Sequence, residues 1–265
     1  MNRKDNSHPT GSSLTTALLL WPTWLWFAKQ DLRSRYRGSV IGPFWLVLNL
    51  GMLVAALSLI YATIFGLELQ VYVPHITTGF LAWFLITHTV NESCTAFISN
   101  SQLIRNYPLP LGVHVLRVLA RNFFLMLHNL IVYGVVALSF GISLNANTLL
   151  VIPGTILVCL LLFFSGFILA TLCARYRDIP HIVSNVMQVV MFITPIMFLK
   201  DMLSRKAFLA EFNPIYHMIE AIRAPLLGTV PELTTWGFLI VANIVTAFIA
   251  FKLMKQLGHR VPFWI

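Results

Sequence analysis

The residues best suited to chemistry in this sequence lie on one predicted helix. His88, Glu92 and Thr95 recur at spacings of four and three within an otherwise apolar run, so a helix would gather them on one face. A carboxyl group within such a run is costly and points either to ion-coupled transport or to a structural ion pair. Arg117 or Arg121 of the next apolar run can pair with Glu92, and we interpret the acid as half of that structural pair.

Recognised catalytic constellations are missing from the sequence. No phosphate loop of the form GxxxxGK[ST] occurs, so any nucleotide energy must come from hydrolysis on another chain. The eight histidines show no metal-ligand spacing, and neither HExxH nor GxSxG is present. We therefore expect no catalytic residue and no metal or cofactor bound by this chain, with a membrane-embedded glycan-processing enzyme as an open alternative.

Composition indicates that these residues belong to a membrane protein. The chain is 58% hydrophobic and only 10% charged, with a mean hydropathy of +0.80. No polar stretch is long enough to fold as a separate aqueous domain, so we expect residues 1–265 to form a single transmembrane domain. Residues 1–13 are a polar tail without a secretory cleavage site, and this tail is expected to be retained.

Six apolar runs are long enough to cross a bilayer, whose hydrocarbon core of about 30 Å needs about 20 residues. The predicted spans are near residues 41–65, 76–97, 118–141, 148–172, 181–199 and 234–254. The segment 14–37 begins with a shorter, tryptophan-rich run interrupted by Pro22, which is typical of an amphipathic helix in the membrane interface. The predicted fold class is therefore an all-α integral membrane protein with six transmembrane helices.

The distribution of basic residues predicts the orientation. With the N-terminus in the cytoplasm, all but four of the 18 lysines and arginines lie in cytoplasmic segments or at cytoplasmic span ends. The exceptions are Lys200, Arg205, Lys206 and Arg223, all in the long segment between the last two spans. Both termini are therefore predicted to be cytoplasmic.

Basic residues are concentrated directly before the first span, at Lys29, Arg33, Arg35 and Arg37. They can anchor the interface helix at anionic lipid headgroups. Lys29, Arg33 and Arg37 recur every four residues and would share one helix face, available to lipid phosphates or to a docking protein. Anchoring alone and anchoring with docking both stay open.

The cytoplasmic connection between the second and third spans contains a candidate short helix, which Ser99 or Ser101 could cap and Pro108 and Pro110 would end. A projecting helix of this kind fits a cleft in a partner protein, although an isolated motif of this kind is more often an ordinary polar loop. Its residues are Ser99, Asn100, Ser101, Gln102, Leu103, Ile104, Arg105, Asn106, Tyr107 and Pro108.

The outer connection between the last two spans also predicts a helix. Asn213 can cap it, Pro214 suits its first position and Gly228 lies beyond its end. The resulting helix of about 14 residues would be about 21 Å long, too short to cross the membrane. We interpret it as a lid in the outer leaflet.

Aromatic residues are abundant, with 20 phenylalanines, 7 tyrosines and 7 tryptophans. Sugar rings expose C–H faces that pack on aromatic rings, so a ring-lined conduit would suit a glycan, although most such rings in membrane proteins contact lipid. The candidate lining residues are Trp45, Tyr61, Trp83, Phe84, Phe192 and Phe198.

Four motifs occur in an order that resembles a known family. They are QDLRSRYRGSVIGPFWLVLN, LIRNYPLP, ARYRDIP and NPIYHMIEAIRAPLLG, and the likeness covers about residues 20–258. Together they resemble the membrane subunit of ABC-2 type exporters, and most of all the polysaccharide (O-antigen) exporters. Leu50 departs from the family pattern, in which many members have a proline after the residue that matches Asn49.

The resemblance implies a homodimer bound to two copies of an ATPase subunit, which would hold ATP and Mg. The substrate would be a lipid-linked polysaccharide moved across the bacterial inner membrane, with no nucleic acid involved. Residues 99–110 would be the coupling helix seated in the ATPase, and residues 29–37 would belong to the interface helix beside it. Other cargo, such as teichoic acid, capsule or small molecules, and an ion-coupled secondary transporter are the alternatives.

By the same resemblance, the outer segment 213–228 would match a re-entrant periplasmic gate helix. The residues assigned to this gate are Asn213, Pro214, Tyr216, Glu220 and Arg223.

Overall fold

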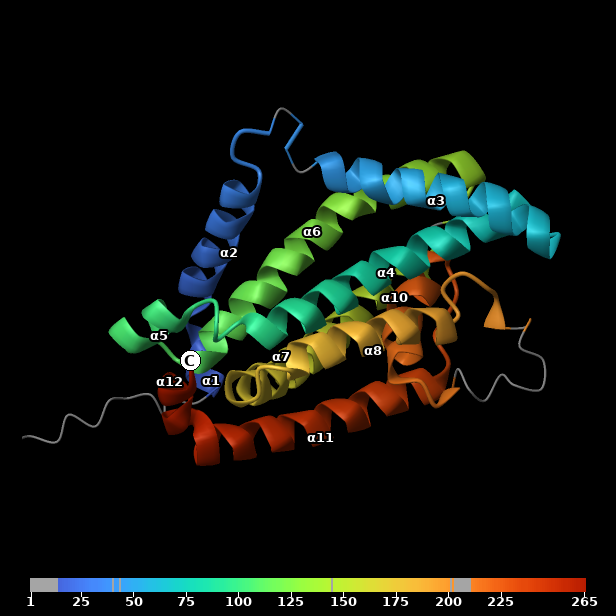
Figure 1. Ribbon diagram of the computed structural model, residues 1–265. Helices are drawn as coiled ribbons and strands as arrows, with labels where there is room; N and C mark the ends of the chain where they lie inside the picture. The colour runs from blue at the N-terminus through green and yellow to red at the C-terminus, as the bar shows by residue number, and fades with distance from the viewer. Residues whose placement is uncertain (1–13, 40, 43, 144, 201, 203–210) are drawn as a thin grey trace, which may run out of the picture.

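The computed structural model describes residues 14–39, 41, 42, 44–143, 145–200, 202 and 211–265. The predicted polar tail, Arg205 and Lys206 lie outside these ranges. Within them the chain is helical and contains no strand, which confirms the all-helical prediction. Five helices are long and apolar enough to cross a membrane. They are α3 (Phe44–Phe65), α4 (Leu69–Thr95), α6 (Leu111–Phe140), α7 (Val151–Arg175) and α11 (Leu233–Leu257) (Figure 1).

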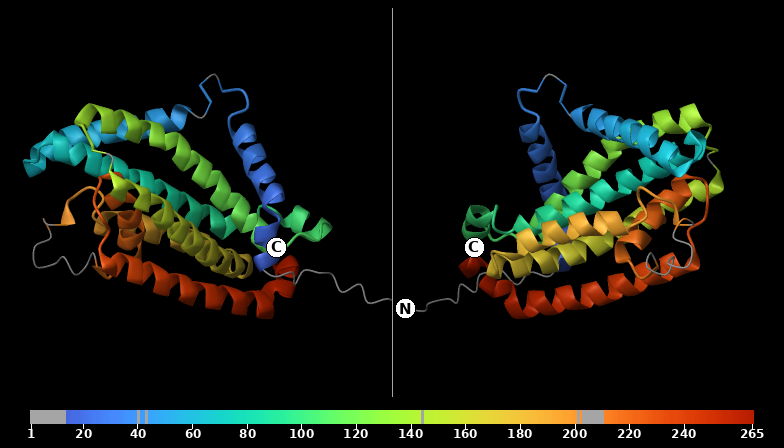
Figure 2. Two further views of the ribbon diagram at one scale, coloured as in Figure 1. Left: turned by 180° about the vertical axis from the view of Figure 1, so that it is seen from behind. Right: turned by 45° about the vertical axis from the view of Figure 1, so that its right-hand side comes forward.

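The predicted sixth span, 181–199, is a shorter helix than expected. Helix α8 (Ile179–Ile193) has 15 residues, about 22 Å at 1.5 Å per residue, and carries the chain from the end of α7 to the opposite end of the molecule (Figures 1 and 2). It ends at Ile193, and Thr194 is extended, because the residue before a proline avoids the helical region and Pro195 follows. Length and hydropathy together therefore support five spans.

Two of the long helices begin about two turns earlier than predicted. Helix α4 begins at Leu69 and α6 at Leu111, whereas hydropathy placed these starts at 76 and 118. Hydropathy marks the part of a helix that lies in hydrocarbon, while backbone hydrogen bonding continues into its polar ends. Pro110 is the residue directly before α6, where its missing N–H costs no intrahelical hydrogen bond.

The segment 14–37 forms two helices where one was predicted. Helices α1 (Leu14–Leu19) and α2 (Trp21–Arg35) are separated at Leu20, and Pro22 lies in the first turn of α2. A proline is tolerated there because the first N–H groups of a helix have no intrahelical partner. Helix α2 packs on α6 and is steeply inclined to the long helices (Figures 1 and 2).

Short helices mark the two ends of the bundle. Helices α5 (Ser101–Asn106) and α12 (Val261–Trp264) lie with α1 at one end, where the chain also finishes (Figure 1). Helix α10 (Pro214–Leu226) lies toward the other end, next to the short helix η1 (Ala146–Leu150). The molecule therefore has one end that carries α5 and another that carries α10.

Helix α4 is the centre of the core. It contacts α3, α6, α7, α8 and α10, and 78% of its most apolar window is buried, against 17% for α3. Helix α3 is attached along one side only, through α4 and α6. Most of its surface is therefore left for lipid or for another protein chain.

Helix α10 packs very closely on α7. A Cβ atom at Gly154 of α7 would overlap the carbonyl oxygen of Ala221 of α10. Position 154 therefore requires glycine, because the backbone of α10 cannot move aside as the end of a flexible side chain can.

We expect Gly154→Ala to lower the thermal unfolding midpoint in mild detergent, because overpacking of this kind typically costs about 1–3 kcal/mol. Gly134→Ala and Gly237→Ala are matched controls, since their added Cβ atoms meet nothing within 4 Å. These two variants should unfold at or slightly above the wild-type midpoint, because alanine is the better helix former. Equal midpoints for all three variants would contradict the close approach.

Candidate functional site

Four charged side chains from three helices meet near the end of the molecule that carries α5. Arg117 of α6 donates from Nε and Nη2 to the two oxygens of Asp31 of α2, at 2.7 and 2.5 Å. Arg121 donates to the same Asp31 at 2.9 Å and to Glu92 of α4 at 2.7 Å. Paired N–H donors facing a carboxylate make strong, directional contacts, so this charged cluster joins α2, α4 and α6.

The predicted partner of Glu92 is found on α6, and the two arginines have different roles. Glu92 accepts from Arg121 and, at 2.7 Å, from Nδ2 of Asn122, with Arg35 at 3.8 Å. Arg117 lies one turn earlier on α6, beneath α2, and binds Asp31 instead of Glu92. The sequence analysis missed Asp31, whose one signal was that it is the single acid among the basic residues of segment 29–37.

The charged cluster is balanced and largely shielded from water. Asp31, Arg117 and Arg121 have side chains that are only 15–20% exposed, and Glu92 is 30% exposed. Two carboxylates face two guanidinium groups, and the Arg117 guanidinium also lies over the ring of Phe27 at 5.0 Å. Each of the two acids accepts hydrogen bonds from at least one arginine.

Arg117 also reaches the base of α5. Its Nη1 donates at 2.7 Å to Oδ1 of Asn100, the residue that begins α5. The prediction that Ser99 or Ser101 caps this helix is wrong, because Asn100 occupies the cap position and directs its side chain to Arg117 and to the Ala96 carbonyl. One guanidinium therefore ties α5 to α2 and α6.

Helix α5 buries one side chain, leaves Ser101 and Leu103 partly exposed, and exposes the rest. Ile104 is 5% exposed, whereas Gln102, Arg105, Asn106 and Tyr107 are exposed. The basic residues predicted for the interface helix, Lys29, Arg33, Arg35 and Arg37, are also exposed on α2 and the turn that follows it. Exposed basic side chains are therefore carried by both α5 and α2.

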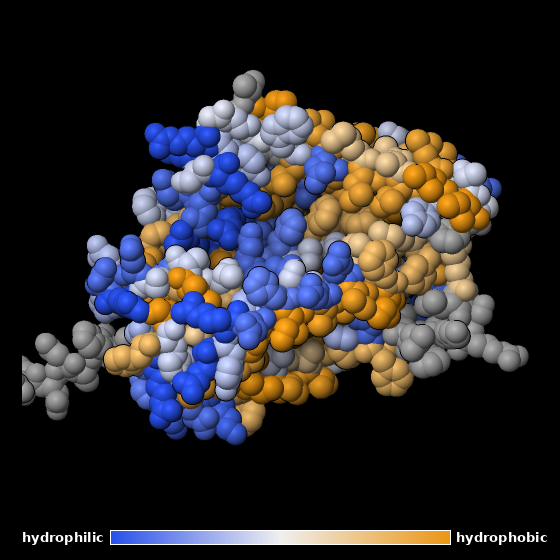
Figure 3. Space-filling view, viewed as in Figure 1, coloured by the Kyte–Doolittle hydropathy of each residue, from blue (hydrophilic) through white to orange (hydrophobic). Residues whose placement is uncertain are grey.

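Polar side chains continue from the charged cluster along one face of the bundle. Ser184, Asn185 and Gln188 of α8 are exposed, Asn49 of α3 is exposed, and His88 of α4 is partly exposed. Figure 3 shows hydrophilic surface extending from the charged end toward the centre of this face, between apolar helices. Polar groups within membrane spans normally face a protein interior or a water-filled space, so this polar lane is not a surface built for lipid.

The candidate lining aromatics are divided between this face and the core. Trp45 of α3 and Phe192 of α8 are 52% and 63% exposed, and Tyr61, Phe84 and Phe198 are partly exposed. Trp83 of α4 is 3% exposed and packs in the hydrophobic core. It therefore lines no exposed surface of this chain.

The predicted outer helix is present as α10, with its predicted cap. Asn213 accepts from the Ile215 N–H at 2.9 Å, and Gly228 follows the helix with φ +79°. The helix is more deeply buried than a lid, with Ile219 and Ile222 at 0% and 1% exposure. Helix α10 is therefore part of the packed core at this end of the bundle.

Arg223 holds α10 in place. This buried arginine, 4% exposed, donates to the Pro195 carbonyl at 2.8 Å and lies 3.3 Å from Nε2 of His75 on α4. Glu220, one turn earlier on α10, is 3.8 Å away and supplies the counter-charge. Because Pro195 lies two residues after the last residue of α8, this bond ties α10 to the end of α8.

A second ion cluster lies outside the spans at this end. Lys200 is 3.3 Å from Glu211 and 3.2 Å from Glu232, and it lies 5.5 Å from the ring of Tyr216. Desolvation opposes the charge of Lys200, but hydrogen bonds to the two carboxylates outweigh it and raise the pKa of Lys200. The hydrogen bond from Lys200 lowers the pKa of Glu232.

The geometry defines a class of protein. It is a multi-pass helical membrane protein with the projecting polar helix α5 at one end and the buried short helix α10 at the other. Residues 23–227 match the family described as ABC-2 type transporter, and the chain belongs to this family. It is an integral protein of the bacterial inner membrane.

Three relatives carry the description "O-antigen export system permease protein RfbA". Two come from Klebsiella pneumoniae, each 25% identical over 238 residues, or 87% of this chain and 90% of the relative. The third, from Myxococcus xanthus, is 26% identical over 207 residues, or 74% of this chain and 76% of the relative. The similarity therefore extends over most of both chains.

We expect Asp31→Asn to destabilise the protein by about 2–4 kcal/mol, because it leaves two shielded arginines without their shared carboxylate. The thermal unfolding midpoint of the detergent-solubilised protein measures this loss. Asp178→Asn is the matched control, since Asp178 is an exposed acid at the same end of the molecule. A wild-type midpoint for Asp31→Asn would show that the charged cluster does not hold α2 on α6.

The link between Lys200 and Glu232 predicts a pH-dependent contribution to stability. Because the pKa of Glu232 is lowered in the folded state, its contribution is present above the ordinary carboxyl pKa and is lost as pH falls through the lowered value. The difference in unfolding midpoint between wild type and Glu232→Gln should therefore be small but measurable at pH 7 and should disappear toward pH 3. A difference that grows on acidification would contradict this assignment.

Proposed function

We propose that this chain is the permease subunit of an ATP-driven exporter that moves a lipid-linked polysaccharide of the O-antigen type across the inner membrane. The observation that carries the proposal is the bond from Arg117 to Asn100 at the base of α5 and to Asp31 of α2. A projecting helix fixed in this way to the membrane bundle is suited to receive a push from a partner protein. The names of the three relatives support the polysaccharide as cargo.

The proposed assembly is a homodimer of this chain with two ATPase subunits, which bind ATP and Mg. The polar lane on α3, α4 and α8 supports the homodimer, because a second copy placed over it would remove polar groups from lipid and enclose a conduit. In this assembly α8 and the residues that follow it act as the sixth span. The end with α5, α2 and α12 is cytoplasmic, and the end with α10 is periplasmic.

The proposed mechanism passes movement from one end of the bundle to the other. Closure of the ATPase subunits on ATP pushes α5, and Arg117 transmits the push to α2 and α6. Rotation of α3 and α8 then opens the conduit between the two copies. Because Arg223 binds the Pro195 carbonyl at the end of α8, the same rotation displaces α10, which acts as the periplasmic gate.

The charged cluster argues against the alternative of an ion-coupled secondary transporter. Such a transporter needs an acid that can take up and release a proton or ion within the membrane. Glu92 is held by Arg121 and Asn122, and Asp31 is held by two arginines, so both acids serve structural pairs. Teichoic acid, capsule or small-molecule cargo would use the same ATP-driven machinery, and identification of the glycan that accumulates when export stops separates these cases.

The double variant Arg105→Glu/Tyr107→Ala tests the role of α5. We expect it to insert normally but to lose most of the ATPase subunit that copurifies with the wild-type chain from mild detergent, because it reverses the charge and removes the ring on the exposed side of α5. The cells should also stop exporting polysaccharide.

Lys252→Glu is the control for this experiment, since it reverses an exposed charge on α11. It should retain the ATPase. Equal ATPase recovery with all three proteins, or export by the wild-type chain in cells that lack the ATPase, would refute the proposed function.

A further inference from the structure

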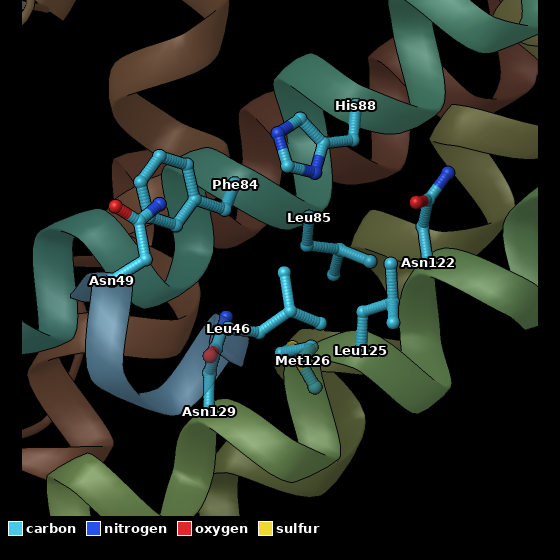
Figure 4. Close-up of a pocket in the computed structure, with 9 residues that line it drawn as sticks. All are labelled: Leu46, Asn49, Phe84, Leu85, His88, Asn122, Leu125, Met126 and Asn129. Atoms are coloured by element: carbon cyan, nitrogen blue, oxygen red, sulfur yellow. The ribbon is translucent and has the colours of Figure 1, made fainter. Parts of the chain in front are cut away.

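A pocket within the membrane-spanning region lies between α3, α4 and α6 (Figure 4). Its volume is about 60 Å³, and its walls combine apolar side chains with four polar ones. The lining residues are Leu46, Asn49, Phe84, Leu85, His88, Asn122, Leu125, Met126 and Asn129. None of them is an acid, a lysine or an arginine.

Two buried amides leave oxygen atoms without a partner among the described residues. Asn122 and Asn129 are 2% and 5% exposed, and the Oδ1 atom of each accepts no hydrogen bond. Asn122 uses its Nδ2 on Glu92, and Figure 4 shows its oxygen on the side of the pocket. An unsatisfied buried acceptor costs about 1–3 kcal/mol, so a hydroxyl or N–H donor placed in the pocket would be favoured at both oxygens.

The lining restricts the chemistry of that ligand. A phosphate or carboxylate would need a cationic side chain, which the lining lacks, and no group of three or more His, Cys, Asp or Glu that could hold a metal ion occurs among the described residues. The ligand must therefore be neutral and must carry hydroxyl or N–H donors. Phe84 adds a flat aromatic wall, on which His88 stacks at a centroid distance of 5.5 Å and an angle of 15°.

Amide acceptors beside an aromatic ring suit a sugar, whose hydroxyl groups donate hydrogen bonds and whose C–H face packs on a ring. A buried water needs about 10–15 Å³ of such volume, so the pocket has room for roughly four to six groups of that size. This is enough for one edge of a sugar ring and too little for an oligosaccharide. The mouth lies at Asn49, which is exposed on α3.

The pocket also continues the polar lane from the charged cluster. Asn129 lies eight residues beyond Arg121 on α6, about 12 Å further along the helix axis. A sugar that entered from the end carrying α5 would meet Glu92 and Asn122 first and Asn129 next.

We propose that this pocket is a subsite for the hydroxyl-bearing edge of one neutral sugar residue, held by Asn122 and Asn129 against Phe84. The proposal rests on the proposed function, since the sugar belongs to the exported polysaccharide. It adds a defined contact inside a single copy of the chain, behind the surface that a second copy would cover.

The test uses the full chain with its ATPase in cells that make the polysaccharide. Benzoylphenylalanine replaces Asn49 at the mouth of the pocket or Leu138 at an 88% exposed, apolar position of α6. After illumination, we expect an adduct that reacts with a carbohydrate stain from position 49 and a lipid adduct alone from position 138.

Second-site variants then test the predicted contacts. Asn129→Leu and, separately, Phe84→Leu should each lower the carbohydrate adduct at position 49 about five- to tenfold, as expected for loss of one contact worth about 1 kcal/mol. Asn243→Leu on α11 is the matched control, because Asn243 is also a buried amide with an unpartnered oxygen. It should leave the adduct unchanged. Thermal midpoints establish that each variant is folded.

Absence of a carbohydrate adduct at position 49, as expected for a pocket that holds only water, would overturn the proposal. An adduct that persists in both Asn129→Leu and Phe84→Leu would overturn it as well. Export is followed in the same cells with and without the ATPase. Export that requires the ATPase but gives no carbohydrate adduct would refute the subsite alone. Export that does not require the ATPase would refute the proposed function.

Discussion

The contact between Arg117 and Asp31 is the constraint on which the rest of this structure depends. An isolated guanidinium in a membrane protein is costly, and here it is neutralised by a carboxylate on a different helix. The same guanidinium binds Asn100, so the position of α5 is coupled to that of α2 and α6. One side chain therefore pairs with a carboxylate on α2 and also binds the residue before α5.

The opposite end of the bundle is also held by an arginine, which here binds mainly uncharged groups. Arg223 is almost completely buried and takes a backbone carbonyl, an imidazole and a distant carboxylate as partners. Glycines bring the helices close enough for this, because a side chain at Gly79 would press on Arg223 and one at Gly154 would overlap the backbone of α10. Two arginines, one at each end, thus connect neighbouring helices through polar contacts.

Much of the architecture could be predicted because it depends on local patterns. Apolar runs predicted the long helices, and the Asn213–Pro214 pair predicted the start of α10, where the cap geometry follows from adjacent residues. Prediction was poorer for side chains whose contacts depend on how the helices pack together. Asn100 took the cap position expected for a serine, and Trp83, a candidate lining residue, lies in the core.

The sequence by itself determined that this chain lies in the membrane, that it is helical, which end carries the basic residues and which connections hold short helices. These properties follow from hydropathy, capping and charge counts within a few residues of each site. Only the tertiary structure decided that Arg117 belongs to Asp31, that Arg223 fastens α10 to the end of α8, and that Asn122 and Asn129 share a pocket with Asn49. Each of these contacts joins different helices, and the rotation of a helix about its axis is set by packing against its neighbours.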